Sequence, residues 1–132
     1  MDYNCKKILI ADNEESILTS LSYALQTKEI EVTICNEFDQ AVDELVSDWY
    51  DLFITDIAMP GAGVIKGLEL LGFIKRHFCS EIIAMSRYRW KEFEAETCRL
   101  NGLNFLNKPL NIKEVLTVCK SSGIPIKEYL LK

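Results

Sequence analysis

Residues Asp51 to Gly61 read Asp-Leu-Phe-Ile-Thr-Asp-Ile-Ala-Met-Pro-Gly, and the fold prediction depends on this stretch. Leu52 to Thr55 is a short apolar run with a β-branched bias, which predicts a buried strand. The run ends at a carboxylate, Asp56, and proline with glycine then breaks regular structure. Asp56 is therefore predicted at the carboxyl end of a strand, where open α/β sheets place their chemistry. Taken alone, Asp56 fits equally well as the start of a turn.

Strand and helix patterns alternate along the rest of the chain. The predicted strands beside 52–55 cover residues 7–11, 31–34, 81–85 and 103–106. The predicted helices cover 14–25, 37–46, 68–78, 87–101 and 112–120, with Asn36 and Asn111 as N-caps and residues 61–67 as a glycine-rich loop. This alternation predicts an α/β fold: a doubly wound, five-stranded parallel sheet in the order 2-1-3-4-5, with helices on both faces (flavodoxin-like).

Length and composition indicate one domain. The chain has 132 residues, of which 48% are hydrophobic and 27% charged. We expect the domain to cover residues 1–123, with 124–132 as a C-terminal tail or the start of a linker. No run approaches the ~18 apolar residues that a membrane span needs, and no signal peptide precedes the first strand, so we expect a cytoplasmic protein. The formal net charge of −5 gives no electrostatic reason to bind nucleic acid or an anionic membrane.

The cysteines do not form a metal or disulfide pattern. Five cysteines stand far apart, at positions 5, 35, 79, 98 and 119, and the only histidine is His77. An odd count without Cys-x-x-Cys spacing argues against a structural zinc site and a disulfide framework. We therefore predict reduced thiols that pack as small core residues.

Four polar side chains come directly after four apolar strands: Asp12, Asp56, Ser86 and Lys108. In a parallel sheet these strand ends share one edge, so the four groups are expected to converge on one pocket. Two carboxylates there suit a hard cation such as Mg²⁺. Asp56 would act as nucleophile toward a phosphoryl group, with the Ser86 hydroxyl and the Lys108 ammonium binding the phosphoryl oxygens.

Each of these residues also has an ordinary structural interpretation. Asp12 fits a helix N-cap about as well as a ligand, and acids at Glu14 and Glu15 fit the first turn of a helix. Ser86 taken alone is better explained as a loop hydroxyl, and Lys108 as a solvated surface lysine. The functional interpretation rests on the coincidence of all four at successive strand ends.

The chain resembles the response regulator receiver domain, the phosphoacceptor module of two-component signalling. The resemblance covers most of the chain and lies in four motifs: Ile8 to Ile17, Asp51 to Pro60, the strand ending at Ser86, and Phe105 to Leu110. It implies a signalling switch, not an enzyme beyond self-catalysed phosphoryl transfer to and from Asp56.

The resemblance also implies a role for individual residues. Asp56 would be the phosphoacceptor, and Ser86 and Lys108 would bind the phosphoryl group, with Ser86 and Phe105 as switch residues. Mg²⁺ would be held by the carboxylates of Asp12 and Asp56, by position 13 and by the backbone carbonyl of Ala58. The implied partners are a sensor histidine kinase or phosphotransfer protein and a downstream effector or output domain.

Three features depart from the family pattern. Asn13 replaces an acid that normally contacts the metal, and an amide oxygen ligates without charge. The segment between Pro60 and the next helix is about three residues longer than usual. Arg87 follows Ser86 where a small residue is usual, which makes it a candidate gate of the pocket, although a solvated loop arginine is the more ordinary explanation.

Three other functions are alternatives to the switch. A pseudo-receiver, a docking module not regulated by phosphorylation, is favoured by Asn13 and Arg87. A phosphatase of the dehalogenase type requires Asp-x-Asp, but the second position here is Ala58. A flavin-binding domain is disfavoured because the acids at 12, 14 and 15 would repel a phosphate.

Overall fold

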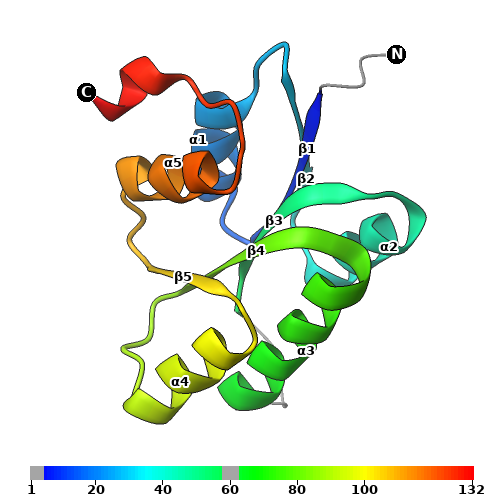
Figure 1. Ribbon diagram of the computed structural model, residues 1–132, viewed down its shortest axis with the longest axis vertical. Coiled ribbons are helices and arrows are strands. Elements are labelled where there is room, and N and C mark those ends of the chain that lie inside the picture. The colour runs from blue at the N-terminus through cyan, green and yellow to red at the C-terminus, as the bar shows by residue number, and fades with distance from the viewer. Residues whose placement is uncertain (1–4, 58–62) are drawn as a thin grey trace.

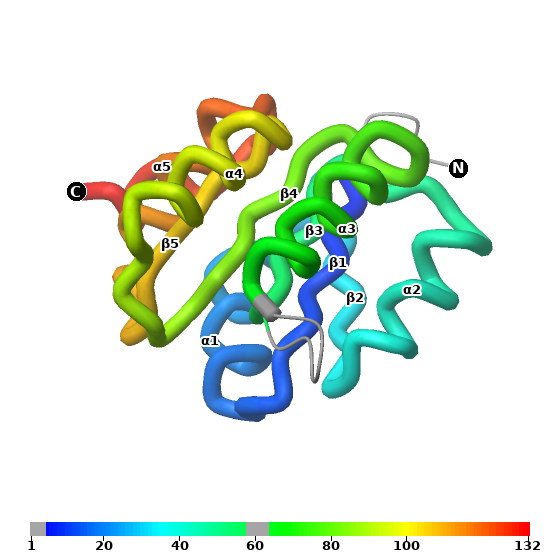
Figure 2. The backbone as a smooth tube through the Cα atoms, turned by 90° about the horizontal axis from the view of Figure 1, so that it is seen from below, coloured from blue at the N-terminus to red at the C-terminus, as the bar shows by residue number. Residues whose placement is uncertain are grey.

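The computed structural model describes residues 5–57 and 63–132 and has one parallel sheet. The strands are β1 (Lys6–Ala11), β2 (Ile30–Cys35), β3 (Tyr50–Asp56), β4 (Cys79–Ser86) and β5 (Asn104–Asn107). They pair in the order β2-β1-β3-β4-β5 (Figure 2). The predicted fold class and strand order are confirmed.

Five helices cover the two faces of the sheet (Figure 1). They are α1 (Glu15–Leu25), α2 (Phe38–Ser47), α3 (Gly63–Phe78), α4 (Glu92–Leu100) and α5 (Ile112–Ser121). Helices α1 and α5 lie on one face, and α2, α3 and α4 lie on the other. A strand buried on both faces must be apolar at successive positions, which explains the continuous apolar runs.

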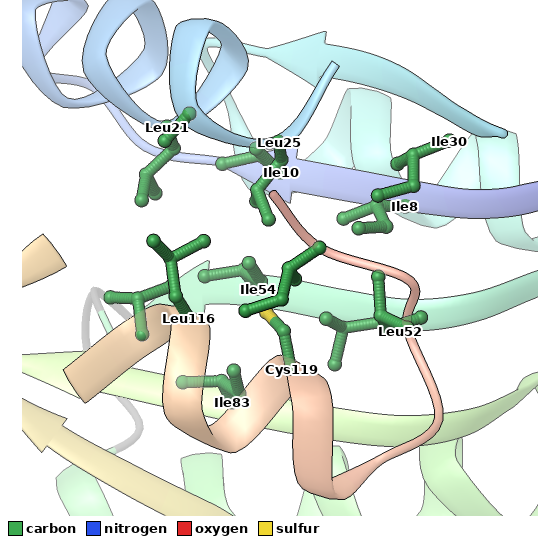
Figure 3. Packing of buried hydrophobic residues seen from close by; sticks show 14 of the residues in the cluster. Ile8, Ile10, Leu21, Leu25, Ile30, Leu52, Ile54, Ile83, Leu116 and Cys119 are labelled. Carbon is green, nitrogen blue, oxygen red and sulfur yellow. The ribbon is translucent and has the colours of Figure 1, made fainter. Parts of the chain in front are cut away.

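Alternate side chains of the central strands pack into two separate hydrophobic cores, one on each face of the sheet. Ile8 and Ile10 of β1 pack with the α1 and α5 side, whereas Leu9 packs with the α2, α3 and α4 side. Figure 3 shows the first core, where Ile54 of β3 lies among side chains from α1 and α5. Each such side chain, fully buried, contributes about 1.5–3 kcal/mol. Burial on both faces therefore fixes β1 and β3 as the rigid centre of the sheet.

The C-terminal segment also packs on the first core. Ile124 and Ile126 are buried there, and a 3₁₀ helix, η1 (Glu128–Leu131), follows. Lys127 Nζ donates to the backbone oxygen of Tyr23 on α1, 3.0 Å away. Whether residues 124–132 also begin a linker remains a prediction.

Several predicted helix boundaries are wrong. Helix α3 begins at Gly63, so residues 63–67 are helical and the segment after Pro60 is shorter than predicted. The prediction treated glycines as breakers, but Val64 packs on the second core and keeps this turn helical. Asn36 is not an N-cap, because α2 is capped at Glu37. Asn111 is confirmed as a cap, since its side chain accepts from the backbone of Lys113 and Glu114.

Helix α4 is shorter than predicted and starts at Glu92. Residues 87–91 form a loop in which the Tyr88 backbone donates to Ser86 Oγ at 3.0 Å, and such local bonds compete with helix formation. The helix ends at Leu100, and Gly102 follows the cap residue, as predicted, with a positive φ of 70° that favours glycine. Cys98 is its one buried residue, whereas Phe93 and Leu100 are exposed.

Candidate functional site

The carboxyl ends of four strands bring the predicted site residues to one edge of the sheet. Asp56 and Ser86 are the last residues of β3 and β4, and Asp12 and Lys108 follow β1 and β5 directly. Backbone hydrogen bonds fix this edge: Ile57 donates to Met85 at 2.8 Å, and Lys108 donates to Ser86 at 2.8 Å. Asp12 and Lys108 are therefore not surface groups, and both are buried, at 3% and 7% exposure.

The Lys108 ammonium lies among three carboxylates. Its Nζ is 2.8 Å from Asp12 Oδ2, 3.3 Å from Asp56 Oδ1 and 3.5 Å from Glu14 Oε1. Asp12 also accepts a hydrogen bond from the backbone of Glu14 through Oδ1, at 2.8 Å, which fixes its orientation. A buried cation of this kind is stabilised only by such partners, because desolvation of an unpaired charge is costly. The peptide bond between Lys108 and Pro109 is cis.

The environment of this cluster raises the pKa of both Lys108 and Asp56, which favours the charged lysine but disfavours the charged aspartate. Burial acts to lower the pKa of Lys108, but the hydrogen bond to Asp12 and the charges of Asp56 and Glu14 outweigh it and raise the pKa. Burial raises the pKa of Asp56, and the nearby carboxylates add to this effect, against the opposing Lys108 ammonium. Lys108 is thus the group that opposes this rise in the pKa of Asp56.

Ser86 and Arg87 line a pocket of about 410 Å³ together with Asp56 and Lys108. Ser86 is buried at 3% exposure, and its Oγ accepts from the Tyr88 backbone, so its proton is free to donate into the pocket. A second pocket, of about 290 Å³, lies on the other side of Asp56, between Asp12 and the start of α2. Asn13 and Asp56 line both pockets.

Arg87 does not extend freely into solvent. Its Nε donates to Glu14 Oε1 at 3.0 Å, and its Nη2 contacts the same oxygen. This bond is the main cause of a lowered pKa at Glu14. The sequence predicted Glu14 in the first turn of a helix and did not indicate it as a site residue. It is instead the N-cap residue, and its position two residues after Asp12 was the available signal.

Phe105 lies half-buried in β5 beneath Trp90 of the loop before α4. Their ring centroids are 3.7 Å apart with the planes tilted by 38°. Trp90 was not assigned a role from the sequence, since nothing local indicates which ring an aromatic residue will contact.

The donor set fits a divalent cation, although the described residues contain no cluster of three or more acidic, histidine or cysteine side chains arranged to hold one. Asp12 and Asp56 supply hard carboxylate oxygens, and Asn13 supplies an amide oxygen beside them. Asp12 Oδ2 is buried, and among the described residues its one ion-pair partner is the Lys108 ammonium, 2.8 Å away. A carboxylate oxygen has two lone pairs, so an oxygen that accepts from one ammonium can still ligate a cation. The fourth predicted ligand, the carbonyl of Ala58, lies outside the described residues.

Within the described ranges, 5–57 and 63–132, no helix has the length and hydropathy needed to cross a membrane.

Sequence comparison places the chain among signalling proteins. The family described as the response regulator receiver domain matches residues 8–120. The alkaline phosphatase synthesis transcriptional regulatory protein PhoP of Bacillus subtilis is 27% identical over 111 residues, which cover 83% of this chain and 45% of that protein. The chain therefore spans about half the length of the curated relatives it matches.

Solved structures share the fold at low sequence identity. The signal receiver domain of an HD domain-containing protein from Pseudomonas fluorescens Pf-5 superposes with a TM-score of 0.74 at 22% identity, covering 92% of this chain and 89% of that one. A response regulator protein from Burkholderia pseudomallei, with a phosphorylated aspartic acid, calcium ion and citrate, gives 0.68 at 20% identity, covering 85% and 65%. At these identities the likeness supports the fold alone.

Proposed function

Because this chain belongs to the response regulator receiver family, we propose that it is a phosphorylation-dependent switch in which Asp56 accepts a phosphoryl group. Receiver domains act in two-component signalling and are signalling modules, not enzymes. The observation that carries the proposal is the position of Lys108 Nζ, 3.3 Å from Asp56 Oδ1 and 2.8 Å from Asp12 Oδ2. That position puts a fixed positive charge where phosphoryl oxygens would gather negative charge.

In the proposed transfer only Asp56 forms a covalent bond, and the other site residues bind the phosphoryl oxygens. A carboxylate oxygen of Asp56 attacks phosphorus, and the P–O bond forms as the donor's P–N bond, in a phosphohistidine, breaks. Lys108 then exchanges part of its contact with Asp56 for the phosphoryl oxygens. The Ser86 hydroxyl, whose lone pair is occupied by the Tyr88 backbone, donates its proton to another of these oxygens.

The same proposal includes Mg²⁺. Asp12, Asn13, Asp56 and the Ala58 carbonyl would hold the ion, which supplies positive charge to the phosphoryl oxygens when it is bound. Lys108 would keep its contact with Asp12 and so hold that carboxylate in place. The proposed partners are a histidine kinase or phosphotransfer protein as donor and an effector or output domain as recipient of the signal.

Beryllofluoride and acetyl phosphate, each with Mg²⁺, test the proposal. Beryllofluoride should bind the wild type, and acetyl phosphate should add one phosphoryl group by mass. Asp56→Asn should abolish both. The matched control is Asp51→Asn, because Asp51 lies at the opposite end of the same strand, where its Oδ2 accepts from the Lys7 backbone at 2.8 Å. Equal labelling of Asp56→Asn and the wild type would refute the assignment.

A second function, docking without regulation by phosphate, is favoured by two observations. Arg87 is bonded to Glu14 at the pocket that contains Asp56, and Asn13 lacks the charge of an acid. A domain of this kind would show no beryllofluoride binding by the wild type at saturating Mg²⁺, yet would still bind its partner.

A further inference from the structure

Glu14 is shared between the phosphoacceptor site and the loop that follows β4. Its Oε1 accepts from Arg87 Nε at 3.0 Å and lies 3.5 Å from Lys108 Nζ. The second carboxylate oxygen takes no part in these contacts. Residues 14 and 87 are 73 positions apart, so the ion pair ties the first strand end to the fourth across the pocket. A single oxygen of Glu14 thus lies between the site lysine, Lys108, and Arg87.

Without Glu14, the site residues carry too little negative charge to balance a dication. Asp12 and Asp56 together carry two negative charges, and Lys108, placed between them, cancels one. Asn13 adds none. A dication would therefore meet a net charge of only one unit while Arg87 neutralises Glu14. Release of Glu14 from Arg87 would double that charge to two units, which is what an acid at position 13 would have supplied.

We propose that a divalent cation and Arg87 compete for Glu14. In the absence of the cation, Arg87 holds Glu14 and lines the pocket that contains Asp56. Cation binding draws Glu14 toward the site as a third carboxylate, and the guanidinium is then free to make a charge-assisted bond to a phosphoryl group on Asp56. This inference rests on the proposed function, because it concerns the same site.

The exposure of the ion pair makes such an exchange feasible. The Arg87 side chain is 62% exposed and that of Glu14 is 31% exposed, so water screens their attraction and the pair is easily broken. By contrast, the Asp12 side chain is fully buried beside Lys108, so solvent screens its attraction for a cation much less than it screens the pair of Arg87 and Glu14. A cation bound beside Asp12 would therefore attract the Glu14 carboxylate more strongly than the exposed Arg87 does.

Competition makes cation affinity depend on Arg87. Isothermal titration calorimetry with MgCl₂ should give Arg87→Ala an affinity at least about fivefold above the wild type. Glu14→Gln should bind at least about fivefold more weakly. In the double variant, loss of Arg87 should have little further effect, because the carboxylate for which it competes is gone.

Two neighbouring residues provide matched controls. Arg89→Ala removes the same charge from an exposed position two residues away, and Glu15→Gln removes an exposed acid next to Glu14. Neither should alter Mg²⁺ affinity beyond a weak, salt-dependent change. If Arg87→Ala behaved like Arg89→Ala, or if the effects of Arg87→Ala and Glu14→Gln simply added, the competition would be refuted.

An NMR titration of the wild type gives an independent readout. The Arg87 Nε–Hε resonance, assigned by its loss in Arg87→Lys, should shift as MgCl₂ is added, and the Arg89 resonance should not. A stationary Arg87 signal at saturating Mg²⁺ would overturn the inference, while beryllofluoride binding abolished by Asp56→Asn would leave the proposed function standing. Failure of the wild type to bind either Mg²⁺ or beryllofluoride would overturn both.

Discussion

Trp90 packs against Phe105 with the two ring centroids 3.7 Å apart, and Trp90 Nε1 is buried without a hydrogen-bond partner among the described residues. Phe105 is the predicted switch aromatic, and Trp90 stands in the loop that begins at Ser86. A movement of either element on phosphorylation must therefore disturb this contact, because both rings share one packed surface.

Trp90 fluorescence is expected to report the switch. In Trp49→Phe, where Trp90 is the single tryptophan, beryllofluoride with Mg²⁺ should shift the emission to longer wavelength as the indole N–H reaches water. Trp49 is 52% exposed and precedes β3, at the opposite end of the sheet from the site. Trp90→Phe should therefore show no shift, and a shift carried by Trp49 would contradict the prediction.

Asn13→Asp is expected to bind Mg²⁺ several-fold more tightly than the wild type. The substitution adds a negative charge beside Asp56 at a position that lines both pockets. Calorimetry in low and high salt measures the change, which should shrink only partly with salt because the site is half-buried. Unchanged affinity would mean that position 13 does not contact the ion.

Arg87→Ala is expected to accelerate both phosphorylation by acetyl phosphate and spontaneous dephosphorylation. Arg87 lines the pocket of Asp56, so its removal opens the route for a small donor and for attacking water. Rates are followed by quench and mass spectrometry, with Arg89→Ala as the control for charge. Identical rates in Arg87→Ala and the wild type would show that the side chain is no gate.

Gly72→Ala is expected to destabilise the fold by about 1–3 kcal/mol. A Cβ at Gly72 would lie 2.3 Å from Asn101 Oδ1 and 2.7 Å from its Cβ, so α3 and the end of α4 must separate. Without the clash, alanine in a helix would be favoured over glycine by about 1 kcal/mol. Urea unfolding should show that adding Asn101→Gly to Gly72→Ala recovers the lost free energy of unfolding. A variant Gly72→Ala as stable as the wild type would contradict the packing.

The buried thiols are expected to react slowly and to make stability fall at high pH. Burial raises the pKa of Cys79 and Cys119 to about 12 and that of Cys98 to about 11, from an ordinary 9.0. Folding holds these thiols protonated, so their contribution to stability is present below pH 9 and falls as the pH rises toward 12. Urea unfolding at pH 8 and pH 10 measures the loss.

Thiol titration with Ellman's reagent at pH 8 tests the same burial. Cys5 is the one half-buried cysteine, and the other four are buried. The native protein should therefore show one fast equivalent, which Cys5→Ser removes, and all five should react in urea. Two or more fast equivalents in the native state would be inconsistent with this packing.

The apolar pattern was sufficient to predict the five strands and their alternation with helices, and the order of the sheet was inferred from that alternation. The central strands are buried on both faces, so nearly every position in them must be apolar, and that constraint is visible in the sequence. The four polar residues at the strand ends were predictable for the same reason. Their convergence follows from the parallel direction of the strands, which brings all carboxyl ends to one edge.

Contacts between distant segments were not predictable in this way. The bond from Arg87 to Glu14 joins residues 73 positions apart, and the approach of Trp90 to Phe105 depends on where the loop after β4 settles. The early start of α3 likewise depends on the core that receives Val64. Long, partly exposed side chains have several staggered rotamers of similar energy, so their direction depends on the partner that the folded chain places nearby.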